Sequence, residues 1–246
     1  MKIFFILMLL SAYLSAEVLK VAFSRSSNEP YVEINKRKLT GGVLKEFVDL
    51  LAKGSGLKVE YVLISKRNQE KSILEGKVDV VCLLNPSDVH NSQEFIWSEP
   101  LYTEENVLIV RKDTAKELNN LHSLYGHKLG TITSHSYPTL QPYFDNQSIE
   151  RVQNKKLSNN INQLRFGIID AVVDTKVSVG YCISKKNVEE QLTVSNKNID
   201  SQELHCMLRK NEQNTLVKFN TVLSQLKEKG SIDKILNRYR AAIHLN

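Results

Sequence analysis

The 246-residue sequence predicts an α/β fold of two similar lobes, each a mostly parallel sheet flanked by helices. Two observations support this prediction. Apolar strand segments alternate with amphipathic helical segments through residues 18–84, which is the pattern of strand–helix–strand units. In addition, a helix end, a glycine, an aspartate and an apolar strand recur in the same order at residues 73–83 and 164–174. Two such units predict two lobes with a cleft between them.

Residues 1–16 have the pattern of a secretory signal peptide. They carry a single charge at Lys2, an apolar run over residues 3–10, and small residues near their end. We expect cleavage after Ala16, although Leu14 stands where a small residue is preferred. The apolar run is too short to span a bilayer. An uncleaved membrane anchor is the alternative, and the mature chain is expected to be exported.

The first lobe is expected to form three strands and two helices in alternation. We expect strands at 18–23, 58–64 and 77–84, and helices at 43–53 and 68–76. The first helix carries its apolar side chains on one broad face, and Gly54 is expected to cap its end. In parallel sheets of this kind, ligands bind beyond the carboxyl ends of the strands. The loops at 24–30, 65–68 and 85–91 are therefore expected to line the cleft.

The second lobe is expected to repeat this arrangement. Gly76 and Gly167 should take the left-handed conformation that lets a helix turn directly into a strand. The lobe would begin near Val107, with its first strand at 127–133 and a turn at 134–136 that opens a helix. A cleft between two lobes indicates capture of a ligand by closure.

Composition excludes several other classes of protein. The net charge of +6 is small and spread along the chain, so nucleic acid is not an expected partner. The sequence contains no GxSxG, HExxH or P-loop motif, and its histidines lack metal-ligand spacing. We therefore expect no cofactor, no metal site and no catalytic residue.

The three cysteines are too few and too widely spaced for a disulfide framework or a CxxC metal site. One bond is compatible with their number. Cys182 and Cys206 are the favoured pair because both lie in the second half of the chain, and Cys82 would then be free. Three free thiols are an equally good alternative.

Five segments follow one another in order along the whole chain: "EPYVEIN", "LTGGVLKEFVDLLAKGSGLKVEY", "EFIWSEPLY", "IDAVVD" and "VLSQLKEKGSIDKILNRY". Together they resemble segments of the family 3 extracellular solute-binding proteins, which have the type II periplasmic binding fold. The resemblance implies a lobe 1 of residues 17–104 and 206–246, a lobe 2 of residues 105–205, and two hinge strands between them. It also implies a periplasmic monomer that binds a small molecule and serves an ABC-type membrane permease. A sensor input for a membrane signalling partner is an alternative.

The resemblance places the ligand contacts of lobe 1 with two departures. The arginine that binds the ligand carboxylate in the family falls on Asn91, and a threonine five residues earlier becomes Pro86. An arginine gives two charge-assisted hydrogen bonds that asparagine cannot replace. Arg25, Lys66 and Arg67 lie in the loops after the first two strands and could take over this role. Asn85 begins the polar loop after the third strand and is a further expected contact. The expected ligand is small and polar, amino-acid-like or anionic.

The remaining contacts are expected from the Pro-aromatic pair of lobe 1 and from lobe 2. Tyr31 resembles the aromatic wall of the family's cleft, and Ser134 and His135 resemble donors at a helix start. Asp174 resembles the aspartate that pairs with a ligand amino group, but it comes one residue early, with Thr175 in the equivalent position. The structural alternatives are core packing for Tyr31, a surface turn for His135 and capping of the next helix for Asp174. A few dehydratase-like enzymes share this fold, and in such a case the catalytic carboxylate would come from Asp88, Glu94 or Asp174.

Overall fold

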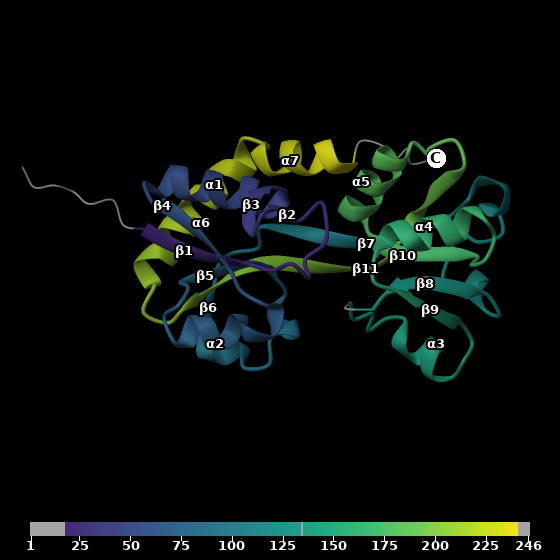
Figure 1. Cartoon of the computed structure of the whole chain (residues 1–246), viewed down its shortest axis with the longest axis horizontal. Coiled ribbons are helices and arrows are strands. Elements are labelled where there is room, and N and C mark those ends of the chain that lie inside the picture. The colour runs from purple at the N-terminus through teal and green to yellow at the C-terminus, as the bar shows by residue number, and fades with distance from the viewer. Residues whose placement is uncertain (1–17, 134, 241–246) are drawn as a thin grey trace, which may run out of the picture.

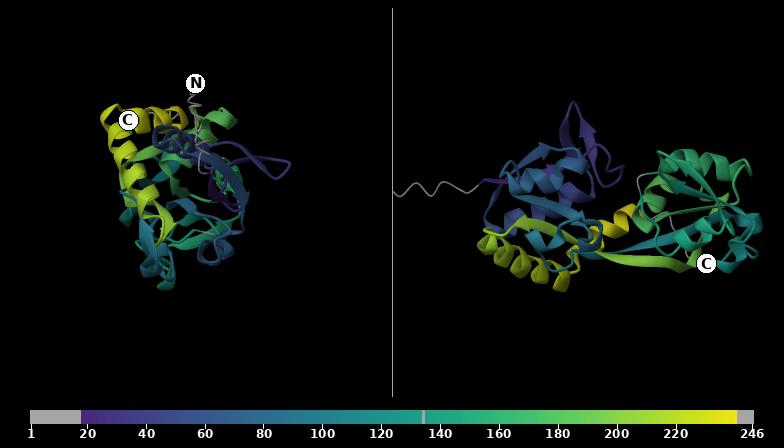
Figure 2. Two further views of the ribbon diagram at one scale, coloured as in Figure 1. Left: turned by 90° about the vertical axis from the view of Figure 1, so that its left-hand side faces the viewer. Right: turned by 90° about the horizontal axis from the view of Figure 1, so that it is seen from below.

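The computed structural model describes residues 18–133 and 135–240. The expected signal peptide and Ser134 lie outside these residues. The chain forms two α/β bodies side by side along its long axis (Figures 1 and 2). We refer to the body that carries β1 as lobe 1 and to the body that carries β8 as lobe 2. Among the helices of the described ranges, none is both long and apolar enough to cross a membrane.

Lobe 1 combines the first part of the chain with its last two helices. Its elements are β1 (Val18–Phe23), β2 (Glu33–Asn35), β3 (Lys38–Gly41), α1 (Val43–Ser55), β4 (Lys58–Leu63), α2 (Gln69–Leu74), β5 (Val80–Leu84), β6 (Phe95–Trp97), α6 (Gln213–Glu228) and α7 (Ser231–Arg240). Strands β4, β1 and β5 are parallel, as the alternating pattern predicts. Helices α1, α6 and α7 cover one face of the sheet and α2 the other (Figure 1).

Lobe 2 is built from the middle of the chain. Its elements are β8 (Lys128–Ile132), α3 (Gln141–Asp145), β9 (Glu150–Asn154), α4 (Leu157–Arg165), β10 (Ala171–Thr175) and α5 (Lys176–Lys186). Strands β10, β8 and β9 are parallel. The expected helix after residues 134–136 is wrong in its position, because α3 begins only at Gln141. An intervening turn with Pro138 separates it from β8.

Two long strands join the lobes. β7 (Tyr102–Arg111) and β11 (Leu192–Arg209) are antiparallel neighbours at the centre of one sheet, ordered β4-β1-β5-β11-β7-β10-β8-β9. They are the two hinge strands that the fold class requires. The lobe boundaries expected at residues 105 and 206 stay a prediction, because both strands run on without a break through these points.

Alternation along the strands distributes the core over both faces of the sheet. In lobe 1, Val21 and Val80 point into the cluster under α1 and α6, whereas Ala22 and Val81 point toward α2. Successive side chains of a strand point to opposite faces, so one apolar run supplies two cores. The strands of lobe 2 divide in the same way, with Val172 and Val173 in different clusters.

Glycines mark the points where the chain turns or comes close to a neighbour. Gly76 and Gly167 have φ values of 69° and 68°, which confirms the left-handed turns expected from the repeated motif. The expected cap at Gly54 is wrong, because α1 runs on to Ser55 and Gly56 takes the left-handed conformation. A Cβ on Gly54 would lie 2.5 Å from Val222 Cγ1, so this glycine permits close packing of α1 on α6.

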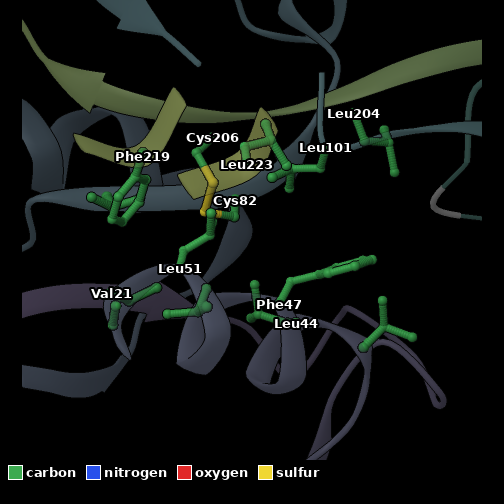
Figure 3. Close-up of a cluster of buried hydrophobic side chains, with 14 of the residues drawn as sticks. Val21, Leu44, Phe47, Leu51, Cys82, Leu101, Leu204, Cys206, Phe219 and Leu223 are labelled. Atoms are coloured by element: carbon green, nitrogen blue, oxygen red, sulfur yellow. A yellow bond between two sulfur atoms is a disulfide. The ribbon is translucent and has the colours of Figure 1, made fainter. Parts of the chain in front are cut away.

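The disulfide joins Cys82 to Cys206, so both expectations for the cysteines are wrong. The two residues face each other on the antiparallel strands β5 and β11, with their Cα atoms 3.9 Å apart. The end of β11 has returned to lobe 1 by residue 206, whereas Cys182 is a buried free thiol in α5 of lobe 2. The bond lies within the apolar core of lobe 1 (Figure 3).

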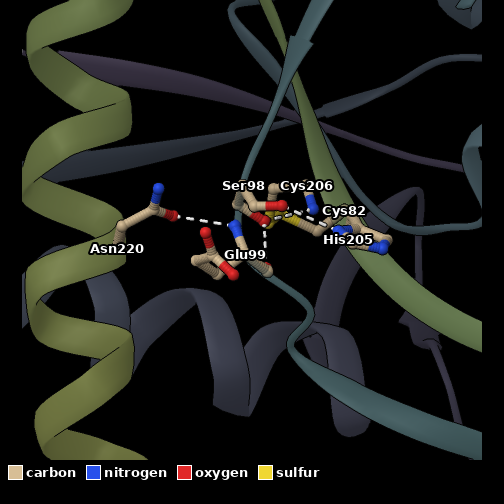
Figure 4. Close-up of a disulfide and its surroundings, with 6 residues drawn as sticks. All are labelled: Cys82, Ser98, Glu99, His205, Cys206 and Asn220. Carbon is tan, nitrogen blue, oxygen red and sulfur yellow. Dashed lines mark hydrogen bonds between the residues drawn. A yellow bond between two sulfur atoms is a disulfide. The ribbon is translucent and has the colours of Figure 1, made fainter.

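The segment between β6 and β7 is attached to the lobe 1 end of β11 beside the disulfide (Figure 4). Ser98 Oγ accepts a hydrogen bond of 2.9 Å from the Cys206 backbone N–H, and Ser98 O lies 2.7 Å from His205 Nδ1. The Glu99 N–H donates to Asn220 Oδ1 of α6 over 2.9 Å. The beginning of one hinge strand is thus held against the other.

Helix α7 reaches from lobe 1 onto α5 of lobe 2 (Figure 1). A Cβ on Gly180 would lie 2.5 Å from Tyr239 O and 2.7 Å from Arg240 Cα, so only glycine permits this close approach. The rings of Tyr181 and Tyr239 are in contact, with centroids 6.3 Å apart. The contact joins the lobes outside the hinge strands.

Candidate functional site

A cavity of about 1520 Å³ lies between the lobes. Loops after β1 and β5 line it from lobe 1, and the segment after β8, the end of β10 and helix α5 line it from lobe 2. Hinge strand β7 contributes Glu104 and Asn106. The carboxyl ends of parallel strands therefore form this site, where such sheets bind their ligands.

The structure places five of the eight predicted site residues on this cavity: Arg25, Tyr31, Asn85, His135 and Asp174. The side chain of Asn85 is partly used, because its Oδ1 accepts hydrogen bonds from the N–H and hydroxyl of Ser87. Arg67 and Asn91 are exposed and do not belong to the lining. Ser134 lies outside the described residues. Ligand binding by all eight residues stays a prediction.

A cluster of hydroxyls surrounds the buried Glu104 carboxyl, a lining residue of the cavity that is 1% exposed. Tyr31 and Tyr102 donate hydrogen bonds of 2.5 and 2.6 Å to its Oε2 atom. The Tyr31 hydroxyl is also hydrogen-bonded to Thr175 Oγ1 over 2.7 Å. Tyr31 therefore connects lobe 1 to the hinge and to lobe 2. Burial raises the pKa of Glu104, against the smaller opposing effects of the two tyrosines.

Asp174 is the second buried carboxyl of the site, with 2% of its surface exposed. It is the next-to-last residue of strand β10, and its Oδ1 accepts a hydrogen bond of 2.7 Å from the Thr175 N–H. Burial raises the pKa of Asp174 to about 7, and the nearby charge of Glu104 acts in the same direction. Within residues 18–133 and 135–240, no basic side chain pairs with Asp174 to offset this burial, so Asp174 changes its charge near neutral pH.

Basic side chains also line the cavity, and most of them are exposed. They are Arg25, Lys36, Arg37, Lys66, Lys156, Lys185 and Lys186. His135 faces Lys66 closely enough to be affected by its charge. Burial, with a smaller contribution from Lys66, lowers the pKa of His135 to about 4, so its imidazole is neutral at pH 7.

One contact crosses the mouth of the cavity. Lys185 Nζ of α5 lies 2.5 Å from Glu29 Oε2 of lobe 1, and the Tyr181 hydroxyl donates to the same oxygen over 3.0 Å. The hydrogen bond from Lys185 lowers the pKa of Glu29. Both side chains of the ion pair are about half exposed, so the pair contributes little to stability. It does connect the two lobes at the edge of the cleft.

Sequence reasoning missed Glu104 and the lobe-crossing Glu29. The signal for Glu104 was available, since it follows Tyr102 by two residues in a strand and so shares its face. Nothing in the sequence indicates that this face lies in a cavity.

Of the alternative catalytic carboxylates, Asp88 and Asp174 line the cavity, whereas Glu94 lies outside it, within 3.7 Å of Lys210. Within the described ranges, no three His, Cys, Asp or Glu side chains are placed to hold a metal ion.

A two-lobed α/β fold with a large cavity between its lobes, lined by both polar and apolar side chains, is typical of proteins that bind small molecules by closing on them. The chain belongs to the bacterial extracellular solute-binding proteins, family 3, whose family model matches residues 19–242. It is therefore a solute-binding protein of an extracellular family, and the family consists of binding proteins rather than enzymes.

Individual relatives are distant but cover most of the chain. A probable histidine-binding protein of Neisseria gonorrhoeae is 22% identical over 229 residues, which are 92% of this chain and 84% of that protein. The L-cystine solute receptor of Neisseria gonorrhoeae, in its unliganded open conformation, matches with a TM-score of 0.73 and 18% identity, over 92% of this chain and 94% of that one. An amino acid ABC transporter substrate-binding protein of Streptococcus pneumoniae, bound to L-arginine, matches with a TM-score of 0.65 and 23% identity, over 92% and 95%. These likenesses establish the fold.

Proposed function

We propose that the protein captures a small, polar, amino-acid-like ligand by closing its lobes and delivers it to an ABC-type membrane permease. The observation that carries this proposal is the position of the cavity. It lies between two bodies joined by β7 and β11, and both bodies line it. A ligand that touches both lobes stabilises only the closed arrangement.

The relatives support an amino-acid-like ligand. Proteins named for histidine and L-cystine, and one bound to L-arginine, share the fold or the family. We propose that Arg25, Tyr31, Asn85, His135 and Asp174 contact the ligand, since all five line the cavity. We also propose that the mature protein is a periplasmic monomer, produced by cleavage after Ala16, as the pattern of residues 1–16 indicates.

A thermal-shift screen of amino acids, dicarboxylates and polyamines tests the proposal. At least one of these solutes should raise the melting temperature of the mature chain in a concentration-dependent manner, because it binds the folded state alone. Small-angle X-ray scattering with the same solute should then show a smaller radius of gyration. A solute that binds at saturation without compaction would contradict closure, and a screen without any hit would count against solute capture.

A control for cavity binding is available in the chain. Arg67 is exposed and lies outside the lining, whereas Arg25 lies within it. Substitution of Arg67 by Ala should leave the affinity unchanged. If Arg25 holds an anionic part of the ligand, Arg25→Ala should weaken binding by about 1.5–3 kcal/mol, with a marked dependence on salt.

A further inference from the structure

Helix α5 belongs to the core of lobe 2 and is also held by lobe 1. One face of the helix, with Val179, Cys182 and Ile183, packs into an apolar cluster of lobe 2. Val177, in the first turn, belongs instead to the core cluster of lobe 1, which includes side chains of α7. Residues three or four apart in a helix share a face, whereas residues two apart do not. One helix therefore contributes side chains to both lobes.

The contact of α5 with α7 is close and largely apolar. Gly180 lies against the backbone of Tyr239 and Arg240, with no room for a Cβ atom, and the rings of Tyr181 and Tyr239 are in contact. The Tyr239 hydroxyl donates to Glu46 Oε1 of α1 over 2.6 Å, which holds the end of α7 on lobe 1. In the described part of the chain, no residue of α7 lines the cavity. A solute in the cavity would therefore leave this contact in place.

A second set of contacts joins α5 to the loop after β1, and these contacts are polar. Glu29 Oε2 accepts hydrogen bonds from Lys185 Nζ over 2.5 Å and from the Tyr181 hydroxyl over 3.0 Å. Two residues further on, the Tyr31 hydroxyl lies 2.7 Å from Thr175 Oγ1, the N-cap of α5. We refer to these bonds as the loop contacts. They reach both ends of α5, and all five side chains line the cavity.

The two sets of contacts differ in what replaces them when they break. Glu29 and Lys185 are about half exposed, so water and salt weaken their attraction. Each loop contact that breaks toward the cavity can be exchanged for a hydrogen bond to water. Separation of α5 from α7 would instead expose Val177, which is fully buried, and water does not compensate for the loss of apolar contact. The loop contacts are therefore the ones that break first.

We propose that α5 turns against α7 at Gly180 when the cleft opens, while its contacts with Glu29 and Tyr31 break. The inference rests on the proposed function, because it describes how the same lobes open and close. Helix α7 is then the fixed restraint on the ligand-free lobes, and the loop contacts are the releasable one. Glu29 and Tyr31 lie two residues apart in one loop, so movement of this loop away from α5 releases both ends of the helix together.

Cys182 reports this opening without any ligand. It follows Tyr181 in α5, lines the cavity and is only 9% exposed. It is the free thiol of the chain, because Cys82 and Cys206 form the disulfide. Burial raises the pKa of Cys182 to about 11, and release of the loop contacts would bring the thiol into water. Its rate of alkylation by iodoacetamide, a neutral reagent, should therefore rise with the fraction of open molecules.

Variants of the ligand-free mature chain test the loop contacts. Glu29→Gln and Tyr31→Phe should each raise the Cys182 alkylation rate about threefold, and the double variant about tenfold, since both weaken the same closed state. Glu75→Gln is the matched control, because it removes an exposed ion pair with Lys77 outside the cavity. Rates in both single variants and in the double variant that equal the rate of this control would overturn the inference.

Salt and a second control separate opening from general destabilisation. High salt should speed alkylation of Cys182 in the wild type, and Glu29→Gln should remove most of this dependence. Ile73→Val lowers stability in the cluster of lobe 1 that faces α2, away from α5, and should leave the rate unchanged. A rise in Ile73→Val as large as that in Glu29→Gln would overturn the inference, because Cys182 would then become accessible by global unfolding alone.

Hydrogen exchange measured by mass spectrometry on the same variants tests the fixed restraint. Release of the loop should speed exchange in residues 24–31, whereas the amides of α7 should exchange at the wild-type rate. Unchanged exchange in residues 24–31, or faster exchange in α7, would overturn the inference. Neither measurement contains a solute. The inference can therefore fail while the thermal-shift screen supports solute capture, and it can hold while that screen finds no solute.

Discussion

Removal of the Cys82–Cys206 disulfide should destabilise the protein substantially. The bond joins residues 124 positions apart in the chain, so its loss restores a large amount of conformational freedom to the unfolded state. For a loop of this length the chain-entropy relation gives about 5 kcal/mol, and measured values are typically about 2–4 kcal/mol. We expect the double variant Cys82→Ala/Cys206→Ala to lose about 2–5 kcal/mol in its free energy of unfolding.

Urea unfolding of four samples tests this expectation. They are the wild type and the double variant, each with and without dithiothreitol. The reductant should lower the stability of the wild type to that of the double variant and leave the variant unchanged. Free energies rather than midpoints must be compared, because a cross-link also changes the compactness of the unfolded state and hence the slope. Cys182→Ala removes a free buried thiol of lobe 2 and serves as the control. The difference in free energy of unfolding between this variant and the wild type should be the same with and without dithiothreitol.

The reasoning would be refuted by a wild type whose stability is the same before and after complete reduction. Alkylation of the unreduced, unfolded protein gives an independent result. One cysteine, Cys182, should react, and mass spectrometry of the alkylated peptides identifies it. Modification of all three cysteines would show that the bond does not form.

Three further predictions concern the two lobes and their contacts. Burial raises the pKa of Asp174 from its ordinary value of 3.8 to about 7. Between about pH 4 and pH 7 the folded state therefore binds one more proton than the unfolded state, and the free energy of unfolding falls as pH rises through this window. Between pH 5 and pH 8 the wild type should lose free energy of unfolding, and Asp174→Asn should remove about 2–3 kcal/mol of that loss. Urea titrations in which the variant keeps the pH dependence of the wild type would contradict this prediction. Gly180→Ala places a methyl group against the backbone of α7 and should lower the free energy of unfolding by about 1–3 kcal/mol. The control Ser184→Ala, at an exposed position of the same helix, should have little effect in thermal unfolding. Glu29→Gln removes the ion pair with Lys185 across the cleft and should change the free energy of unfolding by less than about 1 kcal/mol. It should also increase the radius of gyration measured without ligand. An unchanged radius would show that the ion pair does not restrain the lobes.

The sequence by itself determined the fold class, because its information is local and periodic. Alternation of apolar strands with amphipathic helices predicts parallel sheets, and β4, β1 and β5 are parallel. The turns at Gly76 and Gly167 were predicted for the same reason, since a left-handed residue between a helix and a strand favours glycine at that one position. The loops that end these strands were correctly expected to face a cleft, and Arg25, Tyr31 and Asn85 line it.

The tertiary structure decided everything that depends on which distant segments meet. The chain returns to lobe 1 along β11, and this return pairs Cys206 with Cys82 rather than with the nearer Cys182. The helix expected directly after residues 134–136 begins only at Gln141, because the length of the segment before α3 depends on its packing in lobe 2. Glu104 reads in the sequence as an ordinary charged residue of a strand. It becomes a buried carboxyl only because β7 runs from one lobe into the other. Burial depends on neighbours that no local pattern specifies.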